Sequence, residues 1–358
     1  MKAYFARSLC GLALFGWLLV GTVASDGAQI NYRPLKSIPI GGEGGWDYLE
    51  VDSSAHRLYV SHATKVVVID TATDTVVGEV ADTPGVHGIV VAPDLGRGFT
   101  SNGRENKVGI FDVKMLQPIA KVETGGNPDA ILYESKRAGV YAFNGRSHSA
   151  TVIDARTAKV LATIPLGGKP EFAVEDPDRD RIFVNIEDTS ELVAIDAARR
   201  EVVARWPIAP GEEASGLAID VTHHRLFLGC ANKLMVMMDD NTGKVLGSVP
   251  IGAGVDACKY DPVTQLAFAS CGAGTTTIAR ADGTDALTVV QTLKTARGAR
   301  TMALDPATHK IYLSAAEYPP GAAGERRPQP MAGSFKVLVF GPERGEVLKS
   351  RPAGEKAN

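Results

Sequence analysis

The strongest constraint on the fold of this chain is a pattern that recurs seven times, with a spacing of 40 to 44 residues. An aromatic residue follows the start of every copy by twelve positions. The copies start at Asp47, His87, Asp129, Glu171, Ser215, Asp256 and Arg300, and the aromatic residues are Tyr59, Phe99, Tyr141, Phe183, Phe227, Phe268 and Tyr312. Because aromatic residues make up only 6% of the chain, seven matches at one position indicate a true repeat. A period of this length, built from short β runs, is typical of a β-propeller.

Turn and strand signals divide each copy into four strands. An acidic residue stands five positions after the start in six copies, and Asp before Pro, as in Asp176-Pro177, favours a turn because the carboxylate binds nearby backbone N–H groups. An apolar run that ends in Asp follows in the first five copies, as in Val66–Asp70, and a turn then leads to a fourth run. We therefore predict an all-β, seven-bladed β-propeller with four antiparallel strands per blade, over residues 25–345.

The second strand of the repeat carries a recognisable motif. It occurs as Arg57-Leu58-Tyr59-Val60, Arg181-Ile182-Phe183-Val184, Arg225-Leu226-Phe227-Leu228 and Lys310-Ile311-Tyr312-Leu313. With the Val-Ile-Asp strand that follows, it resembles the YVTN-type seven-bladed β-propeller repeat family over about residues 30–340. The resemblance implies the propeller fold but no single activity, because members of the family have diverse roles. The sixth copy departs from the pattern, with Arg280 in place of the Asp, and a Pro/Gly-rich insertion at 319–333 interrupts the seventh.

The two ends of the chain lie outside the repeat. Lys2 and Arg7 precede an uncharged apolar run, and small residues lead to Ala24, so residues 1–24 are predicted to be a signal peptide. The alternative is an uncleaved anchor. After cleavage we expect a periplasmic or secreted protein with no membrane span. Residues 35–42 resemble the fourth strand and link at 161–168, which predicts ring closure by the mature N-terminal strand. Residues 346–358 are predicted to be a tail that could compete for the same edge.

The charge balance argues against a nucleic-acid partner. Removal of the leader takes away Lys2 and Arg7 and leaves 36 basic against 41 acidic residues. Basic residues gather in the loops of the second and third copies and could hold an anionic ligand, namely Arg104, Lys107, Arg146 and His148. These loops contain no aromatic side chains on which bases could stack. We expect a monomer that binds a small molecule or a protein at the channel face.

Three cysteines remain in the mature chain, Cys230, Cys258 and Cys271. Cys230 and Cys271 occupy the same repeat position in adjacent copies, so a disulfide or a soft-metal pair is conceivable in an oxidising compartment. Adjacent blades diverge outward, however, and a disulfide needs Cα atoms within about 7 Å. The interpretation that we favour is three buried, apolar thiols.

Two rings of residues are predicted at one mouth of the central channel. The first strand of each blade lines the channel, so the seven start residues form the inner ring. Antiparallel pairing brings the residue fifteen positions later to the same mouth. The candidate ligand-binding residues are Trp46, Asp47, His87, Asp129, Glu171, Ser215, Asp256, Arg300, His62, Asn102 and Asn144; the second ring also contains Ile186, Cys230, Cys271 and Ala315.

Four carboxylates that converge on one opening repel each other unless a cation or a proton compensates them. Three interpretations follow. Water fills the mouth, and Arg300 bridges to Asp47 or Asp256; or Asp47, His87 and Asp129 bind a divalent cation. In the third, the mouth is a hydrolytic site, with His87 or Glu171 as the base and Arg300 beside the developing oxyanion.

No catalytic signature singles out one of these interpretations. The sequence has no G-x-S-x-G, no H-E-x-x-H and no phosphate-binding P-loop. We therefore predict an exported binding or scaffolding protein with a polar, mainly acidic site at the channel mouth. The alternative is a lactonase-like or metal-dependent hydrolase that uses the same mouth. A divalent cation is the one cofactor that the residues suggest.

Overall fold

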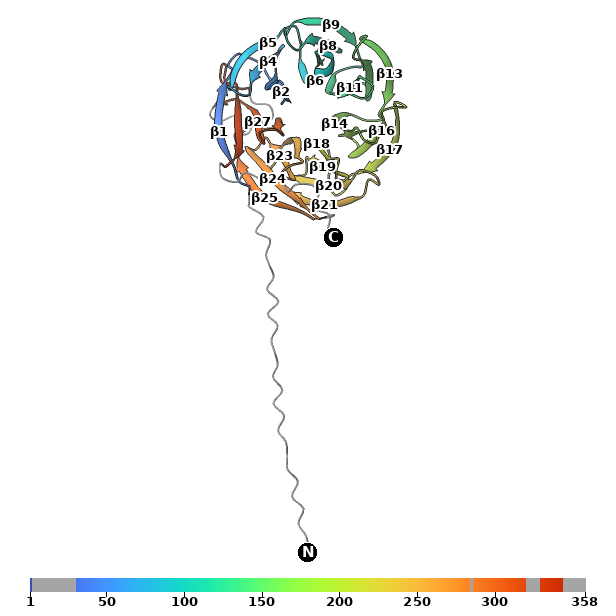
Figure 1. Cartoon of the computed structure of the whole chain (residues 1–358), viewed down its shortest axis with the longest axis vertical. Coiled ribbons are helices and arrows are strands. Elements are labelled where there is room, and N and C mark those ends of the chain that lie inside the picture. Colours follow the sequence, from blue (N-terminus) through green and yellow to red (C-terminus); the bar gives the residue numbers. More distant parts are fainter. Residues whose placement is uncertain (2–29, 284–285, 320–328, 344–358) are drawn as a thin grey trace, which may run out of the picture.

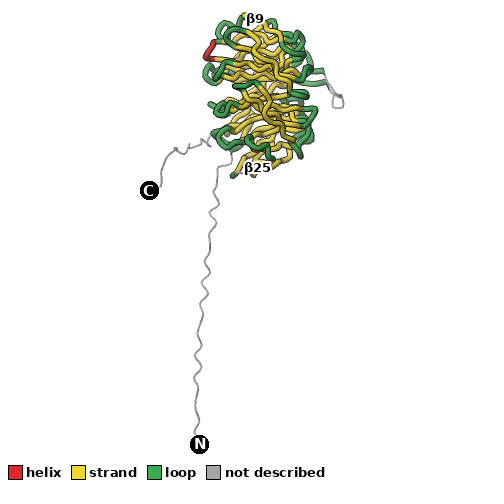
Figure 2. The backbone as a smooth tube through the Cα atoms, turned by 90° about the vertical axis from the view of Figure 1, so that its right-hand side faces the viewer, coloured by secondary structure: helices red, strands yellow, loops and turns green. Residues whose placement is uncertain are grey.

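Seven four-stranded antiparallel sheets form a ring in the computed structural model, which describes residues 1, 30–283, 286–319 and 329–343. In Figure 1 the blades follow one another around a central channel in chain order, and Figure 2 shows the ring from the side. The fold is the predicted all-β, seven-bladed propeller. Among the described residues the one helical element is a single 3₁₀ turn, η1 (Pro93–Leu95), and none forms a helix of sufficient length and apolarity to span a membrane.

The first four blades each consist of four consecutive strands, numbered from the channel outward. They are β2 (Trp46–Asp52), β3 (Arg57–His62), β4 (Lys65–Asp70) and β5 (Thr75–Val80); β6 (Val86–Ala92), β7 (Arg97–Asn102), β8 (Lys107–Asp112) and β9 (Pro118–Glu123); β10 (Pro128–Glu134), β11 (Gly139–Asn144), β12 (Ser149–Asp154) and β13 (Lys159–Pro165); and β14 (Pro170–Asp176), β15 (Arg181–Ile186), β16 (Glu191–Asp196) and β17 (Glu201–Pro207).

The fifth and sixth blades follow the same order, and the seventh combines both ends of the propeller. The fifth and sixth contain β18 (Ala214–Asp220), β19 (Arg225–Cys230), β20 (Leu234–Asp239) and β21 (Val245–Pro250), then β22 (Val255–Asp261), β23 (Leu266–Cys271), β24 (Thr275–Asp282) and β25 (Ala286–Lys294). The seventh contains β26 (Met302–Asp305), β27 (Lys310–Ala315), β28 (Lys336–Pro342) and β1 (Tyr32–Pro39).

The N-terminal strand β1 is the outermost strand of the seventh blade. It pairs antiparallel with β28, from Tyr32 opposite Pro342 to Pro39 opposite Lys336. Figure 1 shows β1 beside the last strands of the chain. The competing segment in the C-terminal tail, 346–358, lies outside the described residues, and so does the predicted signal peptide, 1–24, apart from its first residue.

The repeated aromatic residues anchor the blades, as their spacing predicted. Each is the third residue of the second strand of its blade, and all seven side chains are at most 1% exposed. They belong to apolar clusters that lie largely between adjacent blades; Tyr141, for example, packs with Ile182 and Val193. Burial of one such ring contributes on the order of 2–3 kcal/mol to folding, so the repeat distributes the core evenly around the ring.

The aspartates that end the third strands of the first five blades form the expected turns. Asp70 Oδ1 accepts hydrogen bonds from the backbone N–H of Ala72 at 2.9 Å and of Thr73 at 2.8 Å. The same pair of bonds recurs at Asp112, Asp154, Asp196 and Asp239. In the sixth blade Arg280 replaces this Asp, and β24 continues past it to Asp282. The two outer strands of this blade, β24 and β25, are therefore 8 and 9 residues long.

The three cysteines among the described residues, Cys230, Cys258 and Cys271, are free and buried, which confirms the interpretation that we favoured. Cys230 and Cys271 therefore do not form a disulfide. Burial raises the pKa of the Cys230 thiol to about 12 and that of the Cys271 thiol to about 11. Both are protonated, apolar groups at neutral pH and unsuited to thiolate chemistry.

Candidate binding site at the channel mouth

A β-bulge near the start of the first strand places the inner-ring residues in the first six blades. In β2 the register shifts between Trp46 and Leu49, and Asp47 lies within that shift. Corresponding shifts enclose His87, Asp129, Glu171, Ser215 and Asp256. A bulge inserts an extra residue and re-aims a side chain away from the sheet. The repeat thus aims the same position of six strands at the channel mouth.

In the first two blades a serine of the second strand accepts a hydrogen bond from the bulged backbone. The backbone N–H of Asp47 donates to Ser61 Oγ at 2.9 Å, and that of Gly88 donates to Ser101 Oγ at 2.8 Å. These bonds satisfy N–H groups that the sheet leaves without a ladder partner. The irregular backbone that carries Asp47 and His87 is therefore held by hydrogen bonds.

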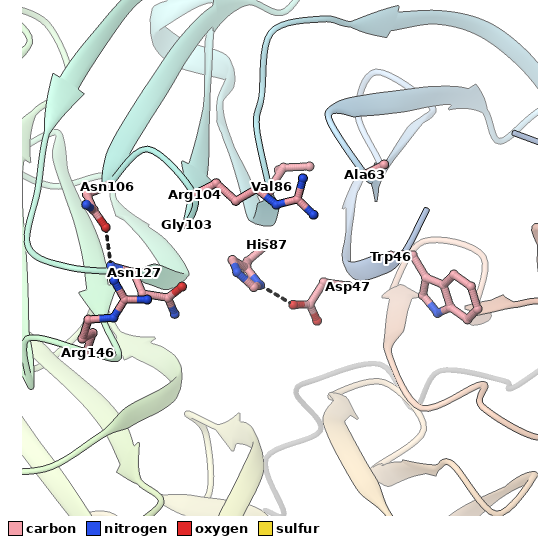
Figure 3. Close-up of a pocket in the computed structure, with 12 residues that line it drawn as sticks. Trp46, Asp47, Ala63, Val86, His87, Gly103, Arg104, Asn106, Asn127 and Arg146 are labelled. Atoms are coloured by element: carbon pink, nitrogen blue, oxygen red, sulfur yellow. Dashed lines mark hydrogen bonds and ion pairs between the residues drawn. The ribbon is translucent and has the colours of Figure 1, made fainter. Parts of the chain in front are cut away.

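His87 lies between two carboxylates that come from the neighbouring blades. Its Nδ1 is 2.7 Å from Asp47 Oδ2 and 3.7 Å from Asp129 Oδ1. Figure 3 shows the imidazole of His87 directed at Asp47. Burial acts against a charged imidazolium, but the hydrogen bond to Asp47 and the nearby carboxylates outweigh it and raise the pKa of His87 to about 9. At neutral pH the imidazole is thus protonated.

Asp129 is the least compensated carboxylate of this group. Its side chain is 14% exposed, and the His87 ring is the one charged partner within 4 Å among the described residues. Burial first, and then repulsion by Asp47, raises the pKa of Asp129 to about 7 against the opposing effect of His87. Removal of a carboxylate from water without hydrogen-bond donors favours its neutral form.

The other two acids of the ring have cationic partners. Glu171 Oε2 is 2.9 Å from Lys169 Nζ, and Asp256 Oδ2 is 3.0 Å from Arg300 Nε. The predicted Arg300 bridge is therefore made to Asp256. Burial raises the pKa of both acids to about 7, with a further increase from Asp129 at Glu171, while Arg300 lowers that of Asp256.

Aromatic side chains that the sequence did not single out meet in the channel next to the ring. The hydroxyl of Tyr48 reaches from the first blade to donate to the carbonyl oxygen of Glu171 in the fourth, at 2.9 Å. Its ring stacks on Phe172 with a centroid distance of 5.4 Å, and Lys259 Nζ lies 5.0 Å from the Phe172 centroid. Burial lowers the pKa of Lys259. These three side chains connect the first, fourth and sixth blades across the channel.

An open pocket of about 470 Å³ lies at the mouth over the first three blades. Asp47 and His87 line it together with Trp46, Arg104, Arg146, Asn106 and Asn127. Figure 3 shows His87 in the middle of this group, with Arg104 and Arg146 on either side. Neither guanidinium forms a hydrogen bond or an ion pair with the part of the chain that the structure describes. The lining thus contains one carboxylate and three cationic groups.

The other two basic residues of these loops, Lys107 and His148, do not line the pocket. Lys107 Nζ forms an ion pair with Glu123 at 3.0 Å, and His148 lies outside the lining of this pocket. The sequence named four loop cations as an anion site, and the structure brings two of them to the pocket. Asn106 and Asn127 were not anticipated; the backbone N–H of Asn127 donates to Asn106 Oδ1 at 2.8 Å and joins the two loops.

The second ring lies beneath the surface of the mouth. His62, Asn102 and Asn144 are at most 2% exposed, and none of them lines the pocket. Asn102 Nδ2 donates to Glu105 Oε1 at 2.8 Å, and Asn144 Nδ2 donates to Thr151 Oγ1 at 3.0 Å. His62 and Trp46 both stack on Phe335, with centroid distances of 4.4 and 5.0 Å. Ser215 is buried and donates to the carbonyl oxygen of Val255 at 3.0 Å.

No model of a known protein family matches the chain, and no curated protein sequence matches it either. The fold defines the class of the protein, a seven-bladed β-propeller. A propeller is a rigid scaffold that hosts many unrelated functions, so the function has to be argued from the mouth and its residues.

Proposed function

We propose that this protein is an exported propeller of the YVTN type that binds a small anionic molecule in the pocket at the channel mouth. One observation carries the proposal: Arg104 and Arg146 line an open pocket of about 470 Å³ with no ionic partner among the described residues. Guanidinium groups bind carboxylate and phosphate oxygens through paired N–H donors. A pocket of this volume falls within the range of small-molecule sites.

The charge of the lining supports an anionic ligand although the inner ring is acidic. Asp129, Glu171 and Asp256 do not line this pocket. The single carboxylate in the lining, Asp47, is compensated by protonated His87 at 2.7 Å. Arg104 and Arg146 then leave an excess of positive charge, and the amide groups of Asn106 and Asn127 add donors that could fix the orientation of the ligand.

Binding without catalysis fits the protonation of His87. A general base must be able to accept a proton near neutral pH, and a histidine with a pKa of about 9 already carries one. A lactonase-like hydrolase remains a second candidate function because of one observation: burial, assisted by Asp129, raises the pKa of Glu171 to about 7, close to the working pH of a base. Glu171 lies outside the lining of the pocket, so binding is the better supported function.

Isothermal titration calorimetry with inorganic phosphate, citrate and neutral glucose tests the proposal. We expect phosphate or citrate to bind and glucose not to bind. The double variant R104Q/R146Q is expected to lose at least tenfold in affinity, whereas K107Q, which removes a cation that is paired with Glu123, is a matched control and should bind as the wild type does. Equal binding by all three proteins, or none by the wild type, would contradict the proposal.

Two further assays test whether the protein is a hydrolase and whether it is exported. Hydrolysis of a simple γ-lactone by the wild type, abolished in E171Q, would establish the hydrolase instead. Export is tested by expression of the full chain in a Gram-negative host, with fractionation and N-terminal sequencing. The proposal predicts a periplasmic protein that begins at Ser25, and a cytoplasmic protein that retains residues 1–24 would contradict it.

A further inference from the structure

Three metal-ligating side chains from three consecutive blades converge at the mouth. Asp47, His87 and Asp129 each offer one ligand atom, and all three atoms lie within 4.8 Å of one another. Ligands of a first-row metal ion at about 2.1 Å are themselves about 3.0–3.4 Å apart. The distances from His87 Nδ1 to Asp47 Oδ2, 2.7 Å, and to Asp129 Oδ1, 3.7 Å, are close to that spacing.

The acids of the inner ring differ in their cationic partners, and the pair Asp47 and Asp129 has the fewest. Glu171 has Lys169 as its partner, and Asp256 has Arg300. Within 4 Å, His87 is the one cationic partner of Asp47 and Asp129 among the described residues. Two carboxylates with a neutral imidazole would carry two negative charges, which one divalent cation neutralises.

A second cluster of the same composition shows how this chain compensates such a group internally. Asp176, His224 and Asp240 also place ligand atoms within 4.8 Å of one another. There, however, Arg179 forms ion pairs with both Asp176 and Asp240. The guanidinium supplies the positive charge, so this cluster has no need of a metal ion. Among the residues described, no arginine or lysine forms an ion pair with Asp47 or Asp129 in the way that Arg179 does in the second cluster.

We propose that Asp47, His87 and Asp129 bind a divalent transition-metal cation. Two carboxylate oxygens and one imidazole nitrogen suit Zn²⁺ or Mn²⁺, whereas Ca²⁺ prefers an all-oxygen site. Binding displaces the proton that His87 Nδ1 otherwise carries. Three protein ligands leave coordination positions for water or for an anionic group, and Asp47 and His87 line the open pocket from which such a group would enter.

The metal alone is the probe, so the test does not depend on the proposed anionic ligand. Purified protein, treated with EDTA and dialysed, is titrated with ZnCl₂ and MnCl₂ by calorimetry, and CaCl₂ is the comparison ion. We expect one equivalent of Zn²⁺ or Mn²⁺ per chain and at least tenfold weaker binding of Ca²⁺. Asp129→Asn and Asp47→Asn, which keep the side-chain shape, are expected to weaken binding at least tenfold. His224→Gln in the second cluster is the matched control and should leave the affinity within about twofold.

Electron paramagnetic resonance gives a second readout, because it measures the concentration of free Mn²⁺ directly and does not depend on the stability of a folded variant. The free-ion signal should disappear in the presence of the wild type and of H224Q, and persist with D129N. Thermal melting verifies that each variant is folded. The proposal is wrong if the wild type binds neither ion up to about 1 mM, if folded D47N and D129N both bind as the wild type does, or if H224Q alone removes binding.

Discussion

A methyl group added at Gly103 would disturb the mouth without any change of charge. Gly103 lies against the imidazole of His87: a Cβ at this position would be 2.7 Å from His87 Nε2 and 2.8 Å from Cδ2. Carbon atoms in contact are normally about 3.5 Å or more apart. The ring must therefore move by about 0.7 Å in G103A. The Nε2–Cδ2 edge is opposite Nδ1, and Asp47 Oδ2 is already 2.7 Å from Nδ1, so the ring cannot shift straight away from the methyl group. It has to rotate instead, which turns Nδ1 out of line with Asp47 and weakens the hydrogen bond.

The magnitude of the effect follows from the pKa of His87. Its rise from 6.5 to about 9 corresponds to roughly 3.5 kcal/mol in favour of the protonated form, at about 1.4 kcal/mol per pKa unit. The hydrogen bond that His87 donates to Asp47 is the largest of the contributions that raise the pKa. We expect G103A to lower the pKa of His87 by at least about one unit, which corresponds to about 1.4 kcal/mol or more.

The assay is an NMR titration of the histidine ring signals in metal-free protein. Gly45→Ala is the matched control, since Gly45 lines the same pocket and a Cβ built there has nothing within 4 Å. The account predicts a His87 pKa near 9 in the wild type and in G45A, and a clearly lower value in G103A. A value near 6.5 in the wild type, or an unchanged value in G103A, would show that the contact with Asp47 does not control the pKa of His87.

Three more predictions concern the whole molecule. Metal-free protein should have a lower free energy of unfolding at pH 8 than at pH 5, because the folded chain holds protons that the unfolded chain has already released. The folded chain holds them between about pH 4 and 7 at Asp129, Glu171 and Asp256, and between about pH 6.5 and 9 at His87. Urea unfolding measures this free energy, and a rise from pH 5 to pH 8 would contradict the prediction. The wild-type mature chain should give no reaction with a thiol reagent when native and three thiols in guanidinium, whereas early reaction would show that the cysteines are accessible. Deletion of residues 25–39 removes β1 and exposes the edge of β28, so we expect a lower melting temperature and self-association by light scattering, and an unchanged monomer would argue against the pairing.

The fold could be predicted because the same strand and turn signals recur in the seven copies of the repeat. The buried aromatic residue of each second strand and the Asp of the third-strand turns occupy the predicted places. In the first six blades the inner-ring residue could also be placed from the spacing, since it lies near the start of the first strand; Arg300 precedes β26, the first strand of the seventh blade.

The details of the site depend on contacts between residues far apart in the sequence, which the period does not encode. The bulge at Asp47 changes the register locally, and the contact of Tyr48 with the fourth blade crosses the channel. Spacing alone could not show that Lys169 compensates Glu171, or that Arg104 and Arg146 reach the pocket while Lys107 is held by Glu123. The burial of His62, Asn102 and Asn144 beneath the loops was missed for the same reason.

The most direct test of the account is a crystal structure of the mature protein grown with MnCl₂ and phosphate, with anomalous diffraction recorded above the manganese absorption edge. The account predicts one anomalous peak between Asp47, His87 and Asp129, with phosphate density beside it toward Arg104 and Arg146. A mouth that holds only water under these conditions, or a peak at Asp176, His224 and Asp240 instead, would contradict the claim that this opening is the binding site.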